Sequence, residues 1–325
     1  MRAIVIDQPG GPEVMRLGET PTPEAGAGEL LVRVRAAGVN RADLQQRQGH
    51  YPPPPGASDI LGLEMAGEVA ALGAGVTGWQ IGERVMALLP GGGYAEYVTA
   101  PAALAMRVPD NLTWEEAGGI PEAFLTAHLG LFPLGGLTSG QVALVHAGAS
   151  GVGTAAIQLA REAGATVIAT AGTDAKVAAV EALGAVGINY RTGDFAAVVG
   201  ERTGGAGANV ILDFIGADYW ERNLAALAME GRIVVISTLS GGDVPMNLGV
   251  LMRKRAQVIG TTLRARPLAQ KTAITRAFAD FALPRFADGR MKVVIDTVYP
   301  LADAAEAHRR MAANANTGKL ILRVD

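Results

Sequence analysis

Cysteine is absent from this chain of 325 residues. That absence excludes disulfides, cysteine-ligated zinc, iron–sulfur clusters and thiol nucleophiles. Long hydrophobic runs are missing too, since no apolar stretch reaches the ~18 residues that a membrane-spanning helix requires. The apolar stretch at the N-terminus is too short for a secretory signal. We therefore expect a cytoplasmic protein that does not associate with membranes.

An excess of positive charge is also lacking. The chain has 28 Lys and Arg residues against 31 Asp and Glu residues, a formal net charge of −3. A nucleic-acid-binding surface needs a basic excess, so no nucleic-acid partner is expected. The four histidines are scattered along the chain and show no paired ligand spacing: His50, His128, His146 and His308. The sequence therefore predicts no metal site.

Glycine, by contrast, is abundant, with 43 residues, and many tight turns are expected. In the middle of the chain, short apolar runs alternate with segments of helical spacing. Six runs are predicted to be strands: 141–148, 166–172, 187–190, 209–216, 231–238 and 257–263. Helices are predicted between them, the clearest at 153–164 and 174–185. This alternation predicts an α/β fold with a doubly wound, six-stranded parallel sheet of the Rossmann type.

The two ends of the chain differ from the middle. Pro and Gly punctuate the first third, which is β-rich, with runs at 30–39, 64–73 and 94–101. The tail has helical patterns at 268–286, up to Pro284, and at 298–313, after Pro300, and then a strand at 319–325. Two placements are open for this tail: it caps the Rossmann domain, or it returns to complete the first domain.

A glycine-rich turn follows the first strand of the predicted Rossmann sheet. The segment HAGASGVGTAA (146–156) aligns with Gly-x-Gly-x-x-Gly, with serine as the central residue. Because it ends a predicted strand and opens a predicted helix, its N–H groups and helix dipole favour a dinucleotide diphosphate. The predicted diphosphate contacts are Gly148, Ser150, Gly151, Val152 and Gly153.

The end of the second predicted strand bears on the choice of cofactor. NAD sites usually place an acidic residue there to hold the ribose 2′-hydroxyl. Here the strand ends in small residues, with Thr173 following and Asp174 one position later, where it also suits a helix start. Thr173, Lys176 and Tyr190 suit a 2′-phosphate, so NADPH is favoured over NADH.

Several segments resemble one known family. The resemblance lies in VNRADLQQRQGHYPPPPGAS (39–58), GLEMAGEV (62–69), GERVMALLPGGGYAEYV (82–98), IPEAFLTA (120–127), HAGASGVGTAAIQL (146–159) and ANANTGKLIL (313–322). In these segments the chain is similar to the zinc-free, zeta-crystallin-like quinone oxidoreductases. These form a branch of the medium-chain dehydrogenase/reductases. NRADL followed by QRQG and Tyr51 points to the subgroup of the tumour-suppressor-induced quinone oxidoreductase.

The resemblance implies a GroES-like catalytic domain at 1–120 and 264–325 around a Rossmann domain at 121–263. It also implies a homodimer formed through the edge of the Rossmann sheet at 257–263. Zinc-dependent members carry Gly-His-Glu, whereas this chain has Gly62, Leu63 and Glu64. Metal catalysis is therefore not expected.

The resemblance further implies a reaction in the interdomain cleft. We expect metal-free and flavin-free transfer of reducing equivalents from NADPH to quinones. Tyr51 is predicted to donate to a developing oxyanion or to stack on a ring, and Asn40 to bond the nicotinamide ribose or the acceptor oxygen. Further cofactor contacts are expected at Thr126, at the strand-end residues Ser237, Thr238, Thr262 and Leu263, and at Asn316 in the tail.

Two other functions are compatible with the same sequence. An enoyl or alkenal reductase of the same superfamily would use the same fold and cofactor, with Tyr51 as a proton donor. An NADPH-bound structural or RNA-binding protein is the alternative of another class, although the net charge argues against RNA. The basic residues Arg253, Lys254, Arg255, Arg264 and Arg266 are interpreted as a solvated face.

Overall fold

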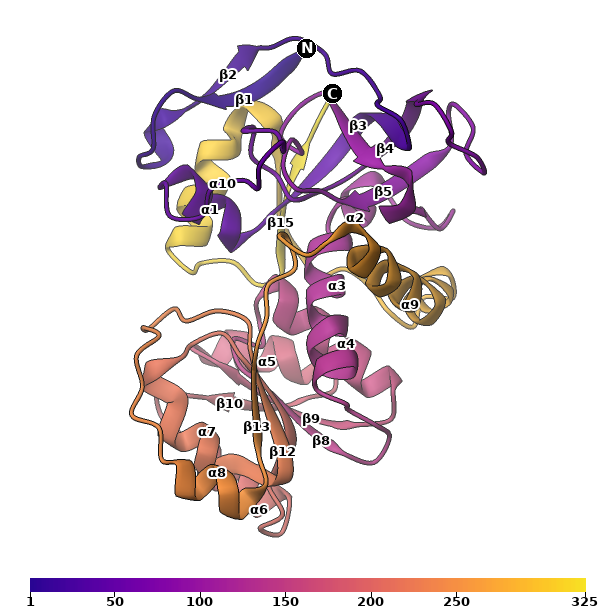
Figure 1. The fold of residues 1–325 in the computed structure, drawn as a ribbon. Helices are drawn as coiled ribbons and strands as arrows, with labels where there is room; N and C mark the ends of the chain where they lie inside the picture. The colour runs from indigo at the N-terminus through magenta and orange to yellow at the C-terminus, as the bar shows by residue number, and fades with distance from the viewer. The chain divides into compact units, whose positions relative to one another are not determined.

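Six parallel strands form the central sheet of the middle of the chain, in the computed structural model that describes residues 1–325 (Figure 1). The strand order is β10-β9-β8-β11-β12-β13, so the chain starts in the middle of the sheet and winds outward in both directions. The strands are β8 (Val142–Val145), β9 (Thr166–Ala171), β10 (Val186–Asn189), β11 (Ala208–Asp213), β12 (Leu227–Val235) and β13 (Gln257–Gly260). The predicted doubly wound Rossmann sheet is confirmed.

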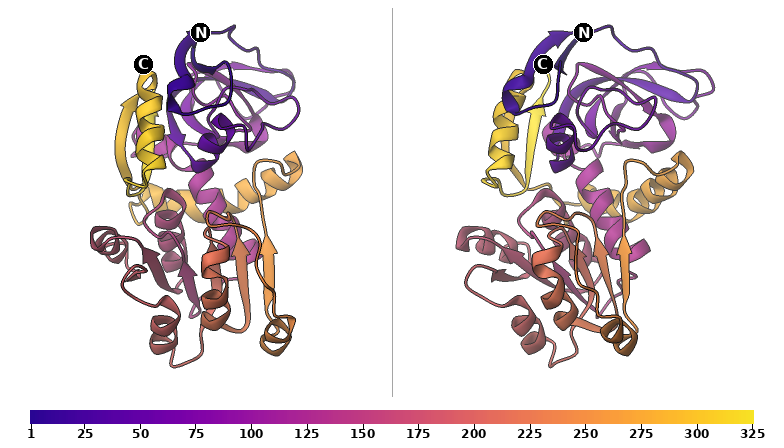
Figure 2. Two further views of the ribbon diagram at one scale, coloured as in Figure 1. Left: turned by 90° about the vertical axis from the view of Figure 1, so that its left-hand side faces the viewer. Right: turned by 60° about the vertical axis from the view of Figure 1, so that its left-hand side comes forward.

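Helices connect these strands and lie on both faces of the sheet (Figure 2). They are α4 (Gly151–Glu162), α5 (Asp174–Glu181), α6 (Phe195–Arg202), η4 (Ala217–Tyr219), α7 (Trp220–Ala226) and α8 (Leu248–Lys254). A buried apolar cluster of strand and helix residues, including Leu144, Ile211 and Phe195, packs the sheet against them. Burial on both faces explains why these strands appear in the sequence as nearly continuous apolar runs.

A second sheet of seven strands is built from both ends of the chain. Its order is β14-β15-β3-β4-β5-β7, and β6 also pairs with β3. These strands are β3 (Glu29–Val39), β4 (Glu64–Leu72), β5 (Arg84–Leu88), β6 (Tyr97–Pro101), β7 (Ala105–Arg107), β14 (Ile295–Pro300) and β15 (Lys319–Arg323). Because β15 pairs antiparallel with β3, with Leu320 opposite Val39, the tail completes this β-rich part of the chain.

The remaining elements surround the second sheet. They are β1 (Arg2–Ile6), η1 (Pro12–Val14), β2 (Met15–Glu19), α1 (Arg41–Arg47), η2 (Ala102–Leu104), α2 (Trp114–Gly118), α9 (Leu268–Ala287), η5 (Leu301–Asp303) and α10 (Ala304–Ala312). Helix α9 was expected to end at Pro284, but it continues to Ala287. The last turn is retained because Phe286 is fully buried against Phe124, with ring centroids 5.0 Å apart.

The chain divides into two compact units. The first unit is Met1–Leu125 with Leu263–Asp325, and the second unit is Thr126–Thr262. Helix α3 (Pro121–Leu129) and the π-helical turn η3 (Gly130–Leu134) follow α2, and the first division between the units falls inside α3. No helix combines the length and the apolarity needed to cross a bilayer.

Candidate functional site

The glycine-rich turn of the second unit is shaped as an anion-binding helix start. Ser150 is the N-cap of α4, and its Oγ accepts the N–H of Gly153 at 3.0 Å. The N–H groups of Gly151 and Val152 have no hydrogen-bond partner within the chain. A Cβ at Gly153 would lie 2.3 Å from the carbonyl oxygen of Ala147, so only glycine fits there. The turn fits a dinucleotide diphosphate at the N-terminus of a twelve-residue helix.

The carboxyl end of β9 brings three of the predicted cofactor residues into one region. Thr173 caps α5 by accepting the N–H of Lys176 at 3.3 Å. The hydroxyl of Tyr190 lies over Gly172, where an added Cβ would be only 2.7 Å from it. Asp174 accepts a hydrogen bond from Asn189 at 2.7 Å, so its carboxylate is already engaged. Lys176 and Tyr190 thus stay the predicted cationic and hydroxyl contacts of a 2′-phosphate.

The other predicted cofactor residues lie in both units. Ser237 and Thr238 follow β12, and Thr262 follows β13, all in the second unit. Thr126 is also in the second unit, within α3. Leu263 belongs to the first unit and is buried. In the tail, Asn316 closes a turn by donating from Nδ2 to the carbonyl oxygen of Gly318 at 2.8 Å.

Asn40 lies in a buried ionic cluster of the first unit. Lys319 Nζ donates to Glu64 Oε1 at 2.5 Å and to Asn40 Oδ1 at 2.8 Å, and Asn40 Nδ2 donates to Glu64 Oε1 at 2.9 Å. The side chain of Lys319 is 3% exposed and that of Glu64 is not exposed. Glu64 Oε2 accepts the backbone N–H of Glu122 at 2.8 Å. Every charged group of this pair therefore has a partner, as burial of charge requires.

A second buried chain of hydrogen bonds leads away from Asp43. Asp43 Oδ2 accepts the backbone N–H of Asn40 at 2.8 Å and the hydroxyl of Tyr94 at 3.0 Å. Tyr94 lies 3.1 Å from His308 Nε2, and Arg47 lies 3.1 Å from His308 Nδ1. Since Tyr94 donates to Asp43 and Arg47 can only donate, this geometry requires a neutral imidazole with its proton on Nε2. Burial raises the pKa of Asp43 to about 6 and lowers the pKa of His308 to about 3.

Tyr51 packs beside Arg264, also in the first unit. The guanidinium carbon of Arg264 is 5.3 Å from the centre of the Tyr51 ring. Arg264 donates to the Pro90 carbonyl oxygen at 2.7 Å and to Gln46 Oε1 at 2.8 Å. It is only 4% exposed, so the expectation of a solvated face is wrong for this residue. The reason is that its guanidinium donates to three carbonyl and amide oxygens of the fold and packs against the Tyr51 ring.

Glu122 is a third carboxyl near this cluster that the sequence did not single out. It is the second residue of α3. Its Oε2 atom is shielded from solvent and has no hydrogen-bond partner. Burial, reinforced by repulsion from Glu64, raises the pKa of Glu122 to about 8.

These side chains do not fit a zinc ion. Leu63, at the position where the zinc-dependent enzymes have histidine, is 1% exposed and apolar. His146 lies in the second unit between Thr170 and Asn223, and burial lowers its pKa to about 4. No three His, Asp or Glu side chains are arranged to hold a metal ion.

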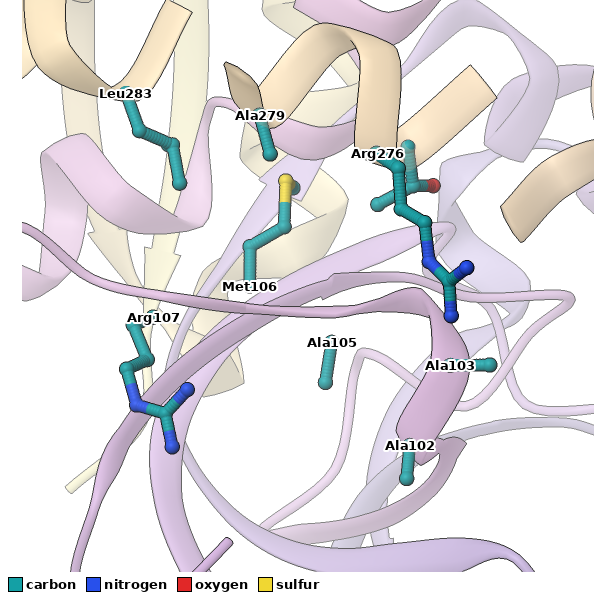
Figure 3. Close-up of a pocket in the computed structure, with 9 residues that line it drawn as sticks. Ala102, Ala103, Ala105, Met106, Arg107, Arg276, Ala279 and Leu283 are labelled. Atoms are coloured by element: carbon teal, nitrogen blue, oxygen red, sulfur yellow. The ribbon is translucent and has the colours of Figure 1, made fainter. Parts of the chain in front are cut away.

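A cavity of about 390 Å³ lies elsewhere in the first unit, between α9 and the η2–β7 segment (Figure 3). Its lining is mostly apolar, with Met106, Leu283 and several alanines, and with Arg107 and Arg276 at its sides. None of the predicted site residues lines it, and Arg107 is already paired with Glu83. We assign it no part in the site.

Sequence reasoning missed Lys319, Glu122, Tyr94 and Arg264 as members of the site. One signal was present: Lys319 begins an apolar strand, where a lysine is unexpected unless it has a buried partner. Glu64 likewise begins a strand whose next three residues are buried. The partners themselves come from distant parts of the chain and leave no local pattern.

Comparison with known families gives two matches. Residues 26–110 match the alcohol dehydrogenase GroES-like domain, and residues 151–279 match the zinc-binding dehydrogenase family. The first match supports the predicted GroES-like character of the β-rich part of the chain.

Curated relatives cover the chain almost completely. A quinone oxidoreductase of Pseudomonas aeruginosa is 34% identical over 319 residues, with 96% of each chain covered. A phenolphthiocerol/phthiocerol polyketide synthase of Mycobacterium tuberculosis is 33% identical over 98% of this chain. This chain spans only 14% of the length of that synthase polypeptide.

Solved structures agree closely with the fold. The quinone oxidoreductase of Escherichia coli, complexed with NADPH, has a TM-score of 0.89 and 31% identity, and the match covers 99% of this chain and 100% of that one. The CurK enoyl reductase has a TM-score of 0.88 and 27% identity, covering 100% and 99%.

We predict that breaking the buried Lys319–Glu64 pair strongly destabilises the first unit. Lys319→Met should lower the free energy of unfolding by about 3–5 kcal/mol, because Glu64 would be left as an unpaired buried charge. The double variant with Glu64→Gln should recover part of this loss. Chemical denaturation measures both.

The matched control is Arg16→Met, which removes an exposed ion pair with Asp7 and should change stability little. Equal stability of Lys319→Met and the wild type would contradict the structural role of the pair.

Proposed function

Because this chain belongs to the medium-chain dehydrogenase/reductase superfamily and is related to its quinone oxidoreductases, we propose that it is an NADPH-dependent quinone reductase that works without metal or flavin. The observation that carries the proposal is that one unit holds an anion-binding helix start, while the other holds a polar cluster without a metal-ligand set. When bound, the reduced nicotinamide would supply a hydride to the acceptor.

The residues of the second unit support the choice of NADPH. The start of α4 offers the N–H groups of Gly151 and Val152 to a diphosphate. Lys176 lies beyond the end of β9, where an NAD site would use an acidic residue, and Tyr190 follows β10 with its hydroxyl over Gly172. An Escherichia coli quinone oxidoreductase of the same fold has been solved with NADPH.

The residues of the first unit support an electron-poor acceptor. No metal-ligand set is available to polarise an alcohol or a simple carbonyl. A quinone is already electrophilic, and reduction needs only stabilisation of the developing oxyanion. The Tyr51 hydroxyl can donate to that oxyanion, and Arg264 adds positive charge beside it.

Reduction of a conjugated C=C bond is the second candidate. The CurK enoyl reductase shares the fold over the full chain, and such a reaction needs a proton donor as well as a hydride. Tyr51 would serve either substrate class. Assays with both acceptor classes distinguish the two functions.

We expect rapid oxidation of NADPH with 9,10-phenanthrenequinone, insensitive to EDTA, and little with trans-2-hexenal. Tyr51→Phe should lower kcat by about 100-fold, the lower end of the range for loss of one donor to an oxyanion or of general acid catalysis. Initial rates at equal cofactor concentrations measure this. Loss of NADPH with the enal alone would assign the chain to C=C reduction, and unchanged kinetics in Tyr51→Phe would remove Tyr51 from catalysis.

A second prediction concerns the 2′-phosphate. Lys176→Ala should raise the Kd for NADPH by about tenfold, the effect expected of one lost charge-assisted hydrogen bond, and leave the Kd for NADH nearly unchanged. Titration calorimetry with both nucleotides gives the comparison. An equal loss for NADH would assign Lys176 to the fold of α5 rather than to the phosphate.

We further propose a homodimer formed through the edge of the parallel sheet. Strand β13 ends the sheet, Val258 on it is 36% exposed, and Leu248 and Met252 on α8 are 70% and 73% exposed. An open strand edge with apolar neighbours is a site for pairing with another chain. Val258→Lys should convert a dimer into a monomer in light scattering, whereas a wild-type monomer would contradict the proposal.

A further inference from the structure

The segment that carries Tyr51 has no helix or strand of its own. It connects α1 to β4 over residues 48–63, and we call it the Tyr51 loop. Four consecutive prolines follow Tyr51, and a proline has no backbone N–H. The backbone of this proline stretch can therefore only accept hydrogen bonds, through its carbonyl oxygens. Donors outside the stretch must hold the loop in place.

Arg264 supplies donors to the Tyr51 loop and to two other segments of the first unit. Its Nη1 donates to the Tyr51 carbonyl oxygen at 3.4 Å, its Nη2 to Gln46 Oε1 at 2.8 Å and its Nε to the Pro90 carbonyl oxygen at 2.7 Å. Gln46 belongs to α1, and Pro90 lies beyond the end of β5. Because a guanidinium holds five donors in one plane, a single side chain can join all three segments.

The Gln46 amide extends this connection to the far side of the prolines. While its Oε1 atom accepts from Arg264, its Nε2 atom donates to the Asp59 carbonyl oxygen at 3.0 Å. Since the amide is planar, the hydrogen bond to Arg264 also fixes the direction of the hydrogen bond to Asp59. The Tyr51 loop is thus held both before and after its proline stretch.

Arg264 also restrains the ring of Tyr51. Its guanidinium carbon lies over the ring, 5.3 Å from the ring centre. Arg264 is buried and Tyr51 is half-buried, and a contact between a cation and a ring is stronger when it is shielded from water. One side chain therefore holds the Tyr51 residue at two points, its carbonyl oxygen and its ring.

We propose that Arg264 is a positioning residue, which holds the Tyr51 loop so that the Tyr51 hydroxyl meets the acceptor oxygen. The proposal rests on the proposed function, in which Tyr51 donates to the developing oxyanion. A donor lowers the barrier most when it is already aimed at the atom that gains charge. Misplacement of such a group by about 1 Å can cost about 100-fold in rate. Arg264 therefore acts on the reaction through Tyr51.

A double-variant cycle on kcat with 9,10-phenanthrenequinone tests this dependence. Arg264→Gln should lower kcat by about 100-fold, as much as Tyr51→Phe. Because both changes act through one hydroxyl, the double variant should also lose about 100-fold, whereas independent residues would give about 10,000-fold. The KM for NADPH should stay at the wild-type value. A loss of about 10,000-fold in the double variant would overturn the proposal.

Two milder variants test the same point if Arg264→Gln does not fold. Arg264→Lys keeps the charge, but an ammonium group lacks the planar fork, so it should restore only part of kcat. Full restoration would assign Arg264 a role through its charge alone and overturn the positioning. Gln46→Leu should lower kcat by about tenfold, the effect of one lost hydrogen bond to a charged group. Wild-type kcat in Gln46→Leu would contradict the proposal.

The matched controls are Arg276→Gln, at an exposed arginine of α9, and Gln48→Leu, at an exposed glutamine directly after α1. Neither side chain is part of the site, and both variants should turn over as the wild type does. Circular dichroism checks that every variant folds.

A fluorine label at position 51 gives a readout that does not depend on activity. With meta-fluorotyrosine in place of Tyr51, and neither cofactor nor acceptor added, the fluorine resonance should lie away from that of the free amino acid. Arg264→Gln should move it toward the free value, and Arg276→Gln should leave it unchanged. An inactive wild type that shows this shift would refute the proposed function and still support the positioning. A resonance that Arg264→Gln does not move would overturn the proposal.

Discussion

The buried pair of Lys319 and Glu64 is the interaction on which the polar site of the first unit depends. It joins β15, from the end of the chain, to β4, from its first quarter. The same carboxylate holds the Asn40 amide at the start of α1 and the Glu122 N–H at the start of α3. Four elements are thus fixed by one charged group, whose burial is tolerable only because each of its oxygens is hydrogen-bonded.

That arrangement has a consequence for charge. One ammonium group faces three carboxyl groups, and it contacts only Glu64 directly. Asp43 is supported instead by Tyr94, which is held in turn by neutral His308. Glu122 has no comparable donor. The packing that stabilises the fold therefore also decides which acid keeps its proton near neutral pH.

The sequence predicted the two parts of the chain unequally well. The parallel sheet was found strand by strand, because strands buried on both faces leave apolar runs and the glycine turn marks where the first helix starts. In the β-rich part of the chain, β1, β2, β5, β7 and β14 were not predicted. These strands are three to six residues long and are often half-exposed, so their hydrophobic pattern is weak.

The candidate site shows the same division. The residues of the nucleotide-binding turn are consecutive, and one local motif contains them. The ionic cluster brings together Asn40, Glu64, Glu122 and Lys319, which no spacing rule connects. Arg264 shows the difficulty most clearly, since it follows a basic stretch that resembles a solvated face and yet its contacts bury it. Burial of a charge is decided by partners that only the folded chain supplies.

The apolar residue beside Glu64 connects this packing to reactivity. Leu63 is buried directly before β4, so the position next to the ionic cluster holds an apolar side chain that cannot bind a metal ion. The cluster can bind, orient and exchange protons, but its residues provide no site for a Lewis acid. A hydride acceptor matched to such a site must be electrophilic by itself, and the protein has to stabilise the resulting negative charge. The Tyr51 hydroxyl and the positive charge of Arg264 suit that requirement, and the first unit already holds both groups in place.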